Sequence, residues 1–157
     1  MSKKVVCVCG FFDPVHSGHV DYLQKAKALA NSESEGEGTL IVIVNNDRQA
    51  AVKKGSAFMP CAERVKMVRS FGCVDAVFEA PDDDHTVCKG IKMIYPDIFA
   101  IGLDEGPEYM KEERDICREL GVKVVCPLGA RIQASSWLIA QSKVNAEKRK
   151  AELAAKA

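Results

Sequence analysis

Two histidines, His16 and His19, flank a Ser-Gly pair between a short apolar run and a stretch with helical spacing. This order predicts that both imidazoles lie at a turn between a buried strand and the start of a helix. Amides at a helix N-terminus lack intrahelical partners, and the helix dipole favours an anion beside them. Imidazoles next to such amides can donate hydrogen bonds to phosphate oxygens, so the segment predicts phosphate chemistry.

The segment 10–19 also resembles a known signature, and the resemblance extends over about residues 4 to 140. The pattern Gly-x-Phe-Asp-x-x-His-x-Gly-His is typical of the cytidylyltransferase-like nucleotidyltransferases. Other features of that family follow in the same order along the chain. The matching positions are Gly10, Phe12, Asp13, His16, Gly18, His19, the Val-Asn-x-Asp of 44–47, Lys54-Gly55, the Pro-x-x-x-Arg of 60–64, Gly102-x-Asp104 and the Ser-rich helix start at 134–139.

This resemblance implies nucleotidyl transfer, in which the phosphate of a small molecule attacks the α-phosphorus of a nucleoside triphosphate and pyrophosphate leaves. The incoming phosphate is already a nucleophile, so no covalent intermediate is needed, and catalysis consists of alignment and charge stabilisation. Mg²⁺ would neutralise the triphosphate and be held by phosphate oxygens and water, with no metal ligand from the protein. The expected partners are therefore a nucleoside triphosphate and a phosphorylated metabolite.

The resemblance assigns catalytic roles to four side chains. His16 and His19 would contact the α- to γ-phosphates, although one of them could instead be a helix-capping residue. Lys54 would steady the triphosphate or the acceptor phosphate, unless it belongs to an exposed loop. Arg64 would bind the acceptor phosphate or pyrophosphate, with a surface salt bridge as the alternative.

Other positions would bind the nucleotide. Phe11 and Phe12 would offer backbone amides while their rings pack, and Asp13 would orient the turn or a histidine. Gly18 would let the backbone approach the phosphates, or serve the geometry of the turn alone. Asp104 would contact the base or ribose.

The last helix is expected to begin at Ser135, and its amides suit the β- and γ-phosphates. Ser135 and Ser136 would then bind the nucleotide, or simply cap the helix. Trp137 is expected to pack, with stacking on the base as the alternative.

The sequence defines the nucleoside triphosphate and the branch of the family less closely than it defines the family. Cytidylyltransferases carry Arg-Thr-x-Gly-x-Ser-Thr before the last helix, whereas here the arginine is displaced to Arg131 and the glycine is Ile132. The sequence also resembles heptose-phosphate adenylyltransferases, glycerol-3-phosphate cytidylyltransferases and archaeal FAD synthetases. We favour ATP over CTP, and a sugar phosphate or a phospho-alcohol as acceptor.

Apolar runs that are short and rich in β-branched residues alternate with segments of helical spacing, which predicts a single α/β domain with a doubly wound, Rossmann-like parallel sheet of about five strands. The segment 1–140 would form the nucleotidyltransferase domain and 141–157 a helical extension of it. We expect strands at 4–9, 40–45, 76–79, 98–101 and 122–126, and helices at 18–30, 60–70, 86–94, 107–120 and from 135 onward.

Composition limits the function further. The 157 residues carry a formal net charge of zero, which gives no general field for nucleic acid or membranes. No apolar stretch approaches the ~20 residues that cross a bilayer. Seven cysteines, an odd number within mostly apolar runs, predict reduced, buried thiols in a cytoplasmic protein, although Cys61 and Cys88 look less clearly buried. The resemblance implies a homodimer, and a catalytically idle nucleotide-binding or scaffold protein is the alternative function.

Overall fold

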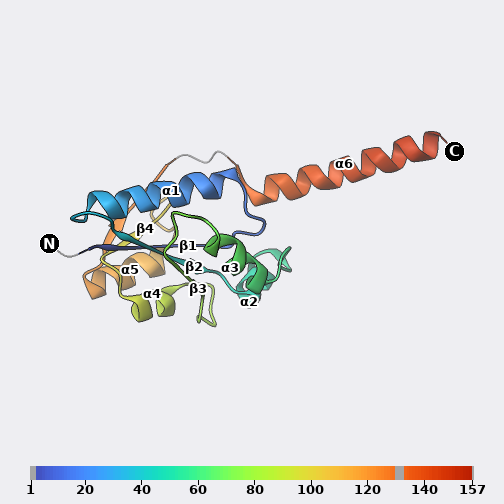
Figure 1. Ribbon diagram of the computed structural model, residues 1–157. Coiled ribbons are helices and arrows are strands. Elements are labelled where there is room, and N and C mark those ends of the chain that lie inside the picture. The colour runs from blue at the N-terminus through green and yellow to red at the C-terminus, as the bar shows by residue number, and fades with distance from the viewer. Residues whose placement is uncertain (1–2, 130–132, 157) are drawn as a thin grey trace.

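The computed structural model describes residues 3–129 and 133–156. A five-stranded parallel sheet forms its centre, with the strand order β3-β2-β1-β4-β5 (Figure 1). The predicted fold is confirmed, and each strand lies within two residues of its expected bounds. The strands are β1 (Val5–Gly10), β2 (Thr39–Val44), β3 (Ala76–Glu79), β4 (Ile98–Ala100) and β5 (Lys123–Val125).

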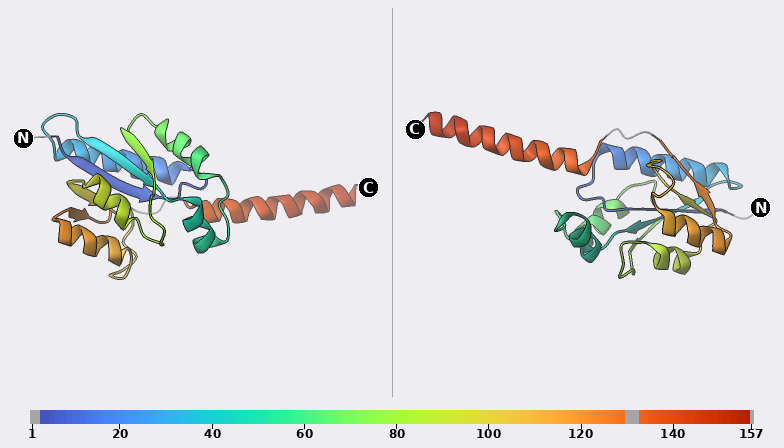
Figure 2. Two further views of the ribbon diagram at one scale, coloured as in Figure 1. Left: turned by 90° about the horizontal axis from the view of Figure 1, so that it is seen from below. Right: turned by 180° about the vertical axis from the view of Figure 1, so that it is seen from behind.

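Alternate residues of the strands point to two separate cores, because side chains in a strand alternate between its faces. Val6 and Val8 pack with Leu23 of helix α1, on the face that α3 also covers. Cys7 packs with Ile91 of α4, on the face that α5 also covers. Helices thus cover both faces of the sheet, as Figure 2 shows from two further directions. These helices are α1 (Ser17–Ser32), α3 (Cys61–Arg69), α4 (Cys88–Ile94) and α5 (Lys111–Leu120).

The sequence analysis missed one helix, α2 (Asp47–Lys54), and treated this segment as a loop. The helix is short and largely polar, so hydrophobic periodicity does not reveal it. Its start is nevertheless encoded, because the Asn46 side chain accepts from the Gln49 amide and the Gln49 side chain accepts from the Asn46 amide. This reciprocal capping box is a sequence-level start signal.

Three predicted helix starts were too early. Pro60 is the residue before α3 rather than its first residue. Helix α5 begins at Lys111, four residues after Pro107, because Met110 has a left-handed backbone with φ 55° and turns the chain. Helix α4 begins at Cys88, two residues later than expected.

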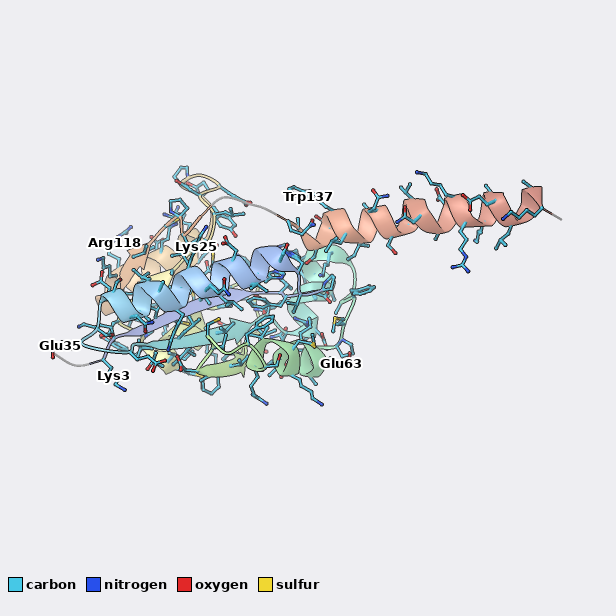
Figure 3. All side chains as sticks on the ribbon, turned by 45° about the horizontal axis from the view of Figure 1, so that its top comes forward. Lys3, Lys25, Glu35, Glu63, Arg118 and Trp137 are labelled. Atoms are coloured by element: carbon cyan, nitrogen blue, oxygen red, sulfur yellow. The ribbon has the colours of Figure 1, made fainter. Side chains whose placement is uncertain are left out.

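The last helix, α6 (Ser135–Ala155), begins where it was predicted and projects away from the sheet (Figures 1 and 2). None of its residues is buried. Trp137, which we expected to pack, lies near the start of this helix (Figure 3) and is 53% exposed. Its side chain is therefore not a core residue of the described fold.

Candidate active site

The loop after β1 makes a tight turn before α1. Phe12 has a left-handed backbone, with φ 52°, and a fully buried ring. A Cβ on Gly10 would lie 3.0 Å from that ring, so the glycine makes room for it. A non-glycine residue in this conformation carries strain, which buried packing of the ring must offset. The turn directs the following residues across the carboxyl end of the sheet, where ligands bind in open parallel sheets.

His16 and His19 form a capping box at the N-terminus of α1. The Nδ1 of His16, the N-cap residue, accepts from the Gly18 amide at 3.1 Å, and the Nδ1 of His19 accepts from the His16 amide at 3.2 Å. The two rings stack with their centroids 3.8 Å apart. Helix capping, which the sequence left as an alternative to phosphate contact, is thus present for both histidines, and it uses only one nitrogen of each ring.

The capping bonds determine where the imidazole protons lie. A nitrogen that accepts a hydrogen bond is unprotonated, so each neutral ring carries its proton on Nε2. Burial, followed by the proximity of His16, lowers the pKa of His19 to about 3, and burial lowers the pKa of His16. Within the described residues neither Nε2 has a hydrogen-bond partner. At neutral pH the pair therefore presents two Nε2–H donors beside a helix N-terminus.

Gly18 is required by this arrangement. A Cβ at this position would lie 2.9 Å from Cε1 of His16 and 3.2 Å from the Gln133 carbonyl oxygen. Real Cβ atoms essentially never come within 3.0 Å of a neighbour, so any side chain would displace the His16 ring, and the contact with the Gln133 carbonyl would be tight. The glycine thus allows His16 to fold back onto the helix start.

A second helix N-terminus reaches the same loop. The Ser135 hydroxyl, at the start of α6, donates to the Pro14 carbonyl at 2.8 Å. The residue that precedes the helix is Ala134, which forms no side-chain cap, so the alternative in which Ser135 or Ser136 caps α6 does not hold. Ser136 is exposed. The amides at the starts of α1 and α6 therefore lie near one another, on the two sides of the Pro14 loop.

Asp13 and Lys54 form a partly buried ion pair between the loop after β1 and the end of α2. The Asp13 side chain is fully buried and accepts from the Lys54 ammonium at 2.6 Å and from the amides of Phe58 and Met59 at 2.8 and 2.6 Å. Although burial raises the pKa of Asp13, these hydrogen bonds bring it below its usual value. Asp13 therefore orients the turn, one of the two roles expected for it, and contacts neither histidine.

Arg64 does not lie where the sequence analysis placed it. Its side chain is 0% exposed, and its guanidinium donates to three carbonyl oxygens, those of Phe11, Asn45 and Met59, at 2.6 to 2.8 Å. It also pairs with Asp47 at 2.8 Å. Neither a phosphate contact nor a surface salt bridge fits this environment. Arg64 instead joins the loops after β1 and β2 to the segment before α3.

The remaining predicted residues lie at the same edge of the sheet. Phe11 is partly buried and contributes its carbonyl to Arg64, while the nearby Lys53 and Lys54 ammonium groups lie 4.6 and 5.6 Å from the centroid of its ring. Asp104 is exposed, and its carboxylate accepts from the Gly106 amide. Arg131 and Ile132, which carried the argument about the nucleotide, lie outside the described residues.

A buried amide network that the sequence analysis missed fixes α2. The Asn46 side chain donates to the carbonyls of Ala80 and Asp82, and the Gln49 side chain donates to those of Asp84 and Thr86. These bonds attach α2 to the loop after β3. The capping box of Asn46 and Gln49 was the available signal, since it predicts a helix whose end carries two lysines.

The cysteines and acidic residues of the described part of the chain show no cluster suited to a metal ion. All seven thiols are free, and Cys61, which the sequence left as less clearly buried, is 3% exposed. Burial raises the pKa of Cys61 to about 12 and that of Cys117 to about 11, so both are ordinary buried thiols. In residues 3–129 and 133–156, no three His, Cys, Asp or Glu side chains gather closely enough to hold a metal ion. No helix of this part of the chain is both long and apolar enough to cross a membrane.

Known proteins are similar to this chain in sequence. The chain is 37% identical over 120 residues to the bifunctional protein HldE of Helicobacter pylori strain Shi470, covering 71% of this chain and 24% of that protein. It is 33% identical over 123 residues to the FAD synthase of Ferroglobus placidus, covering 77% of this chain and 72% of that protein. The chain thus spans about a quarter of the length of the bifunctional relatives and most of the FAD synthase.

A solved structure has a fold similar to that of this chain. The lipopolysaccharide core biosynthesis protein of Thermoplasma volcanium superposes with a TM-score of 0.63 and 26% identity, covering 78% of this chain and 93% of the other. The sequence profile of the cytidylyltransferase-like family matches residues 7–142, which include the histidine capping box, Lys54, Arg64 and the start of α6. The resemblance predicted from the motifs is confirmed, and this chain belongs to the cytidylyltransferase-like family of nucleotidyltransferases.

Proposed function

We propose that this protein transfers the nucleotidyl group of a nucleoside triphosphate to the phosphate of a small phosphorylated metabolite and releases pyrophosphate. The observation that carries the proposal is the pair of neutral imidazoles at the N-terminus of α1, each with an Nε2–H that has no partner in residues 3–129 and 133–156. The nearby start of α6 supports it, because both helix ends favour bound phosphate. The acceptor class is a sugar phosphate or a phospho-alcohol.

The reaction requires no covalent intermediate. An oxygen of the acceptor phosphate forms a bond to the α-phosphorus, and the bond from that phosphorus to the oxygen it shares with the β-phosphorus breaks. The electron pair of the broken bond stays on pyrophosphate, and no proton has to move. His16 and His19 would donate to phosphate oxygens whose negative charge grows, which is the kind of stabilisation that preorganised donors provide.

Mg²⁺ would enter as part of the substrate. The Asp13 carboxylate, which lies in the loop that carries the histidines, is already bound to Lys54 and to two amides, which leaves it unsuited to hold a cation. The ion would therefore be bound by the triphosphate and by water, and these hard oxygen ligands suit it.

ATP is our proposed nucleotide. The similarity to an FAD synthase supports this choice, because FAD contains an adenylyl group, and the displaced arginine of the cytidylyltransferase motif also supports it. Thermal unfolding with each of the four nucleoside triphosphates and Mg²⁺ tests the choice. A ligand at ~100 times its Kd adds about 2.7 kcal/mol to the free energy of unfolding, so ATP should raise Tm clearly. A rise with CTP and none with ATP would refute it.

Pyrophosphate release tests the activity itself. The protein and Mg-ATP are incubated with a panel of phosphorylated sugars and alcohols, and release above the no-acceptor control is expected with at least one of them. If ATP stabilises the protein but no acceptor gives release, the chain is an idle nucleotide-binding protein, and the proposed activity is wrong.

We further propose a cytoplasmic homodimer. Val52 of α2 and Phe58 in the segment that follows are 82% and 63% exposed. They lie after β2, and the family resemblance implies pairing near the first helix and the segment after the second strand. Light scattering at micromolar concentration should give twice the mass of the chain. A monomer would contradict this proposal.

A further inference from the structure

Helix α6 is long and exposes apolar surface that nothing in its own chain covers. Its 21 residues span about 30 Å, roughly the diameter of a small domain, and none of them is buried. Four of the exposed large apolar side chains of the described residues lie on it, namely Trp137, Leu138, Val144 and Leu153. Because helices in proteins are stabilised mainly by packing of an apolar face, this surface calls for a partner.

One face of α6 combines apolar and basic side chains. Residues seven positions apart are separated by nearly two helical turns and therefore share a face. The apolar row of this face is Ile139, Ala146 and Leu153, and the basic side chains beside it are Lys143, Arg149 and Lys150. We call these six residues the basic face. Lys148 lies about 140° around the helix from Leu153, on the opposite side.

A surface of opposite charge lies on α4 and α5. Residues 82–119, which we call the acidic half, include the loop after β3, α4, β4 and α5, and they carry eleven acidic and five basic side chains. Residues 135–156 carry five basic and two acidic side chains, so the two segments have net charges of −6 and +3. Met93 and Tyr95, at the end of α4, are 70% and 60% exposed and add apolar surface to the acidic half.

Within one chain, α6 points away from the acidic half. It leaves the body beside the start of α1, where Ser135 bonds to Pro14, and runs in the direction opposite to α4 and α5 (Figures 1 and 2). A second copy of the chain brings an identical acidic half of its own. Its carboxylates and exposed apolar side chains complement the basic face in both charge and polarity.

The arrangement in the figures allows this contact to form twice in a symmetric dimer. A two-fold axis beside α2, along the viewing direction of Figure 1, carries the acidic half of a second copy to the place where α6 runs. The left view of Figure 2 shows α6 level with α4, so the two also agree in depth. Each α6 then reaches the acidic half of the other copy, and α2 with its exposed Val52 lies beside the axis.

We infer that α6 is an exchanged arm, whose basic face docks on the acidic half of a second copy of this chain. The apolar row covers exposed apolar surface at the end of α4, and the three basic side chains lie against carboxylates. The inference goes beyond the proposed activity, because it assigns the projecting helix a partner. It adds a second, charge-dependent contact to the proposed homodimer.

Sedimentation velocity of the full chain tests the charge dependence. The Kd of the dimer should rise about tenfold between about 0.1 M and about 1 M salt, because the Debye length falls from ~10 to ~3 Å. Lys150→Glu should raise Kd by about tenfold, since it places a like charge against the acidic half. Lys148→Glu makes the same change of charge on the opposite side of α6 and should leave Kd within about twofold of the wild type.

Cross-linking tests which surfaces meet. An equal mixture of unlabelled and nitrogen-15-labelled chain is treated with a carbodiimide, which joins amines to carboxylates without a spacer. Linked peptides with one light and one heavy member should connect Lys143 or Lys150 to acidic residues of 82–119. Circular dichroism of both glutamate variants should match the wild type, because no residue of α6 is buried.

The inference is overturned if the wild type is a monomer at micromolar concentration, if Lys148→Glu weakens the dimer as much as Lys150→Glu, or if the mixed cross-links omit α6. It is also overturned if the chain stays monomeric and binds vesicles of phosphatidylserine and phosphatidylcholine but not vesicles of phosphatidylcholine alone. Failure of the proposed function looks different. In that case the dimer depends on Lys150, and the wild type releases no pyrophosphate with any acceptor.

Discussion

Both His16 and His19 cap α1 through Nδ1, and the proposed function gives their Nε2–H groups a catalytic role, so suitable substitutions should separate the two roles. His19→Gln keeps a capping-box residue at the third helical position, and His16→Asn keeps a preferred N-cap residue. Both variants should accept the amide hydrogen bonds that the Nδ1 atoms accept at 3.1 and 3.2 Å. Neither amide side chain reaches as far as Nε2 while its oxygen caps the helix.

The magnitudes differ between capping and catalysis. His16→Ala removes a cap and should lower the free energy of unfolding by about 1 kcal/mol, whereas His16→Asn should change it little. Loss of one preorganised donor typically lowers kcat by ~100- to 1,000-fold. We therefore expect His16→Asn and His19→Gln to melt like the wild type and to lose about as much kcat as the alanine variants, with nucleotide affinity much less affected.

Steady-state pyrophosphate release, run beside urea unfolding of the same preparations, provides the measurement. The comparison of each amide variant with its alanine variant is the internal control, because the two should differ in stability and not in kcat. Near-normal turnover in folded His16→Asn and His19→Gln would refute the reasoning and leave the histidines as helix caps only.

Three other outcomes follow from the same contacts. Because the pKa of His19 is lowered to about 3 in the folded chain, the unfolded chain takes up a proton below about pH 6.5 and the folded chain does not until about pH 3. The contribution of His19 to stability is therefore complete above pH 6.5 and falls toward pH 3. Urea unfolding should show a free energy of unfolding about 1–2 kcal/mol lower at pH 5 than at pH 7.5, and His19→Gln should remove part of that difference. Arg64→Lys, with one ammonium in place of a planar fork, should lower the free energy of unfolding by about 2 kcal/mol, whereas the exposed Arg69→Lys should not change it. Gly18→Ala should lower kcat by about 10- to 100-fold, because a 1 Å displacement of a catalytic group can cost ~100-fold. Gly72→Ala, whose Cβ would meet nothing within 4 Å, should match the wild type in urea unfolding and in pyrophosphate release.

The sequence predicted the sheet well, because buried parallel strands are continuous apolar runs and local pattern is enough to find them. It failed at α2, where eight largely polar residues form a helix through caps and a buried amide network. It failed at Arg64 for a different reason. An arginine one turn into a helix looks exposed from sequence, and only the convergence of three carbonyls from separate segments makes its burial favourable. Such a convergence is a property of tertiary structure.

The histidine motif illustrates the opposite case, in which chemistry and local structure share the same atoms. A serine or aspartate at the N-cap would satisfy the free amide equally well, but it would offer the substrate no donor on the far side of the side chain. Imidazole places an acceptor and a donor on opposite sides of one rigid ring, so the cap that orients the ring also fixes which nitrogen carries the proton. Protonation would add a hydrogen to Nδ1 and abolish the capping bond, and the lowered pKa of both rings opposes this. The burial that stabilises the start of α1 therefore also keeps the pair neutral, with both Nε2–H groups as donors, so two histidines spaced three residues apart carry the helix cap and the proposed phosphate contacts in the same rings.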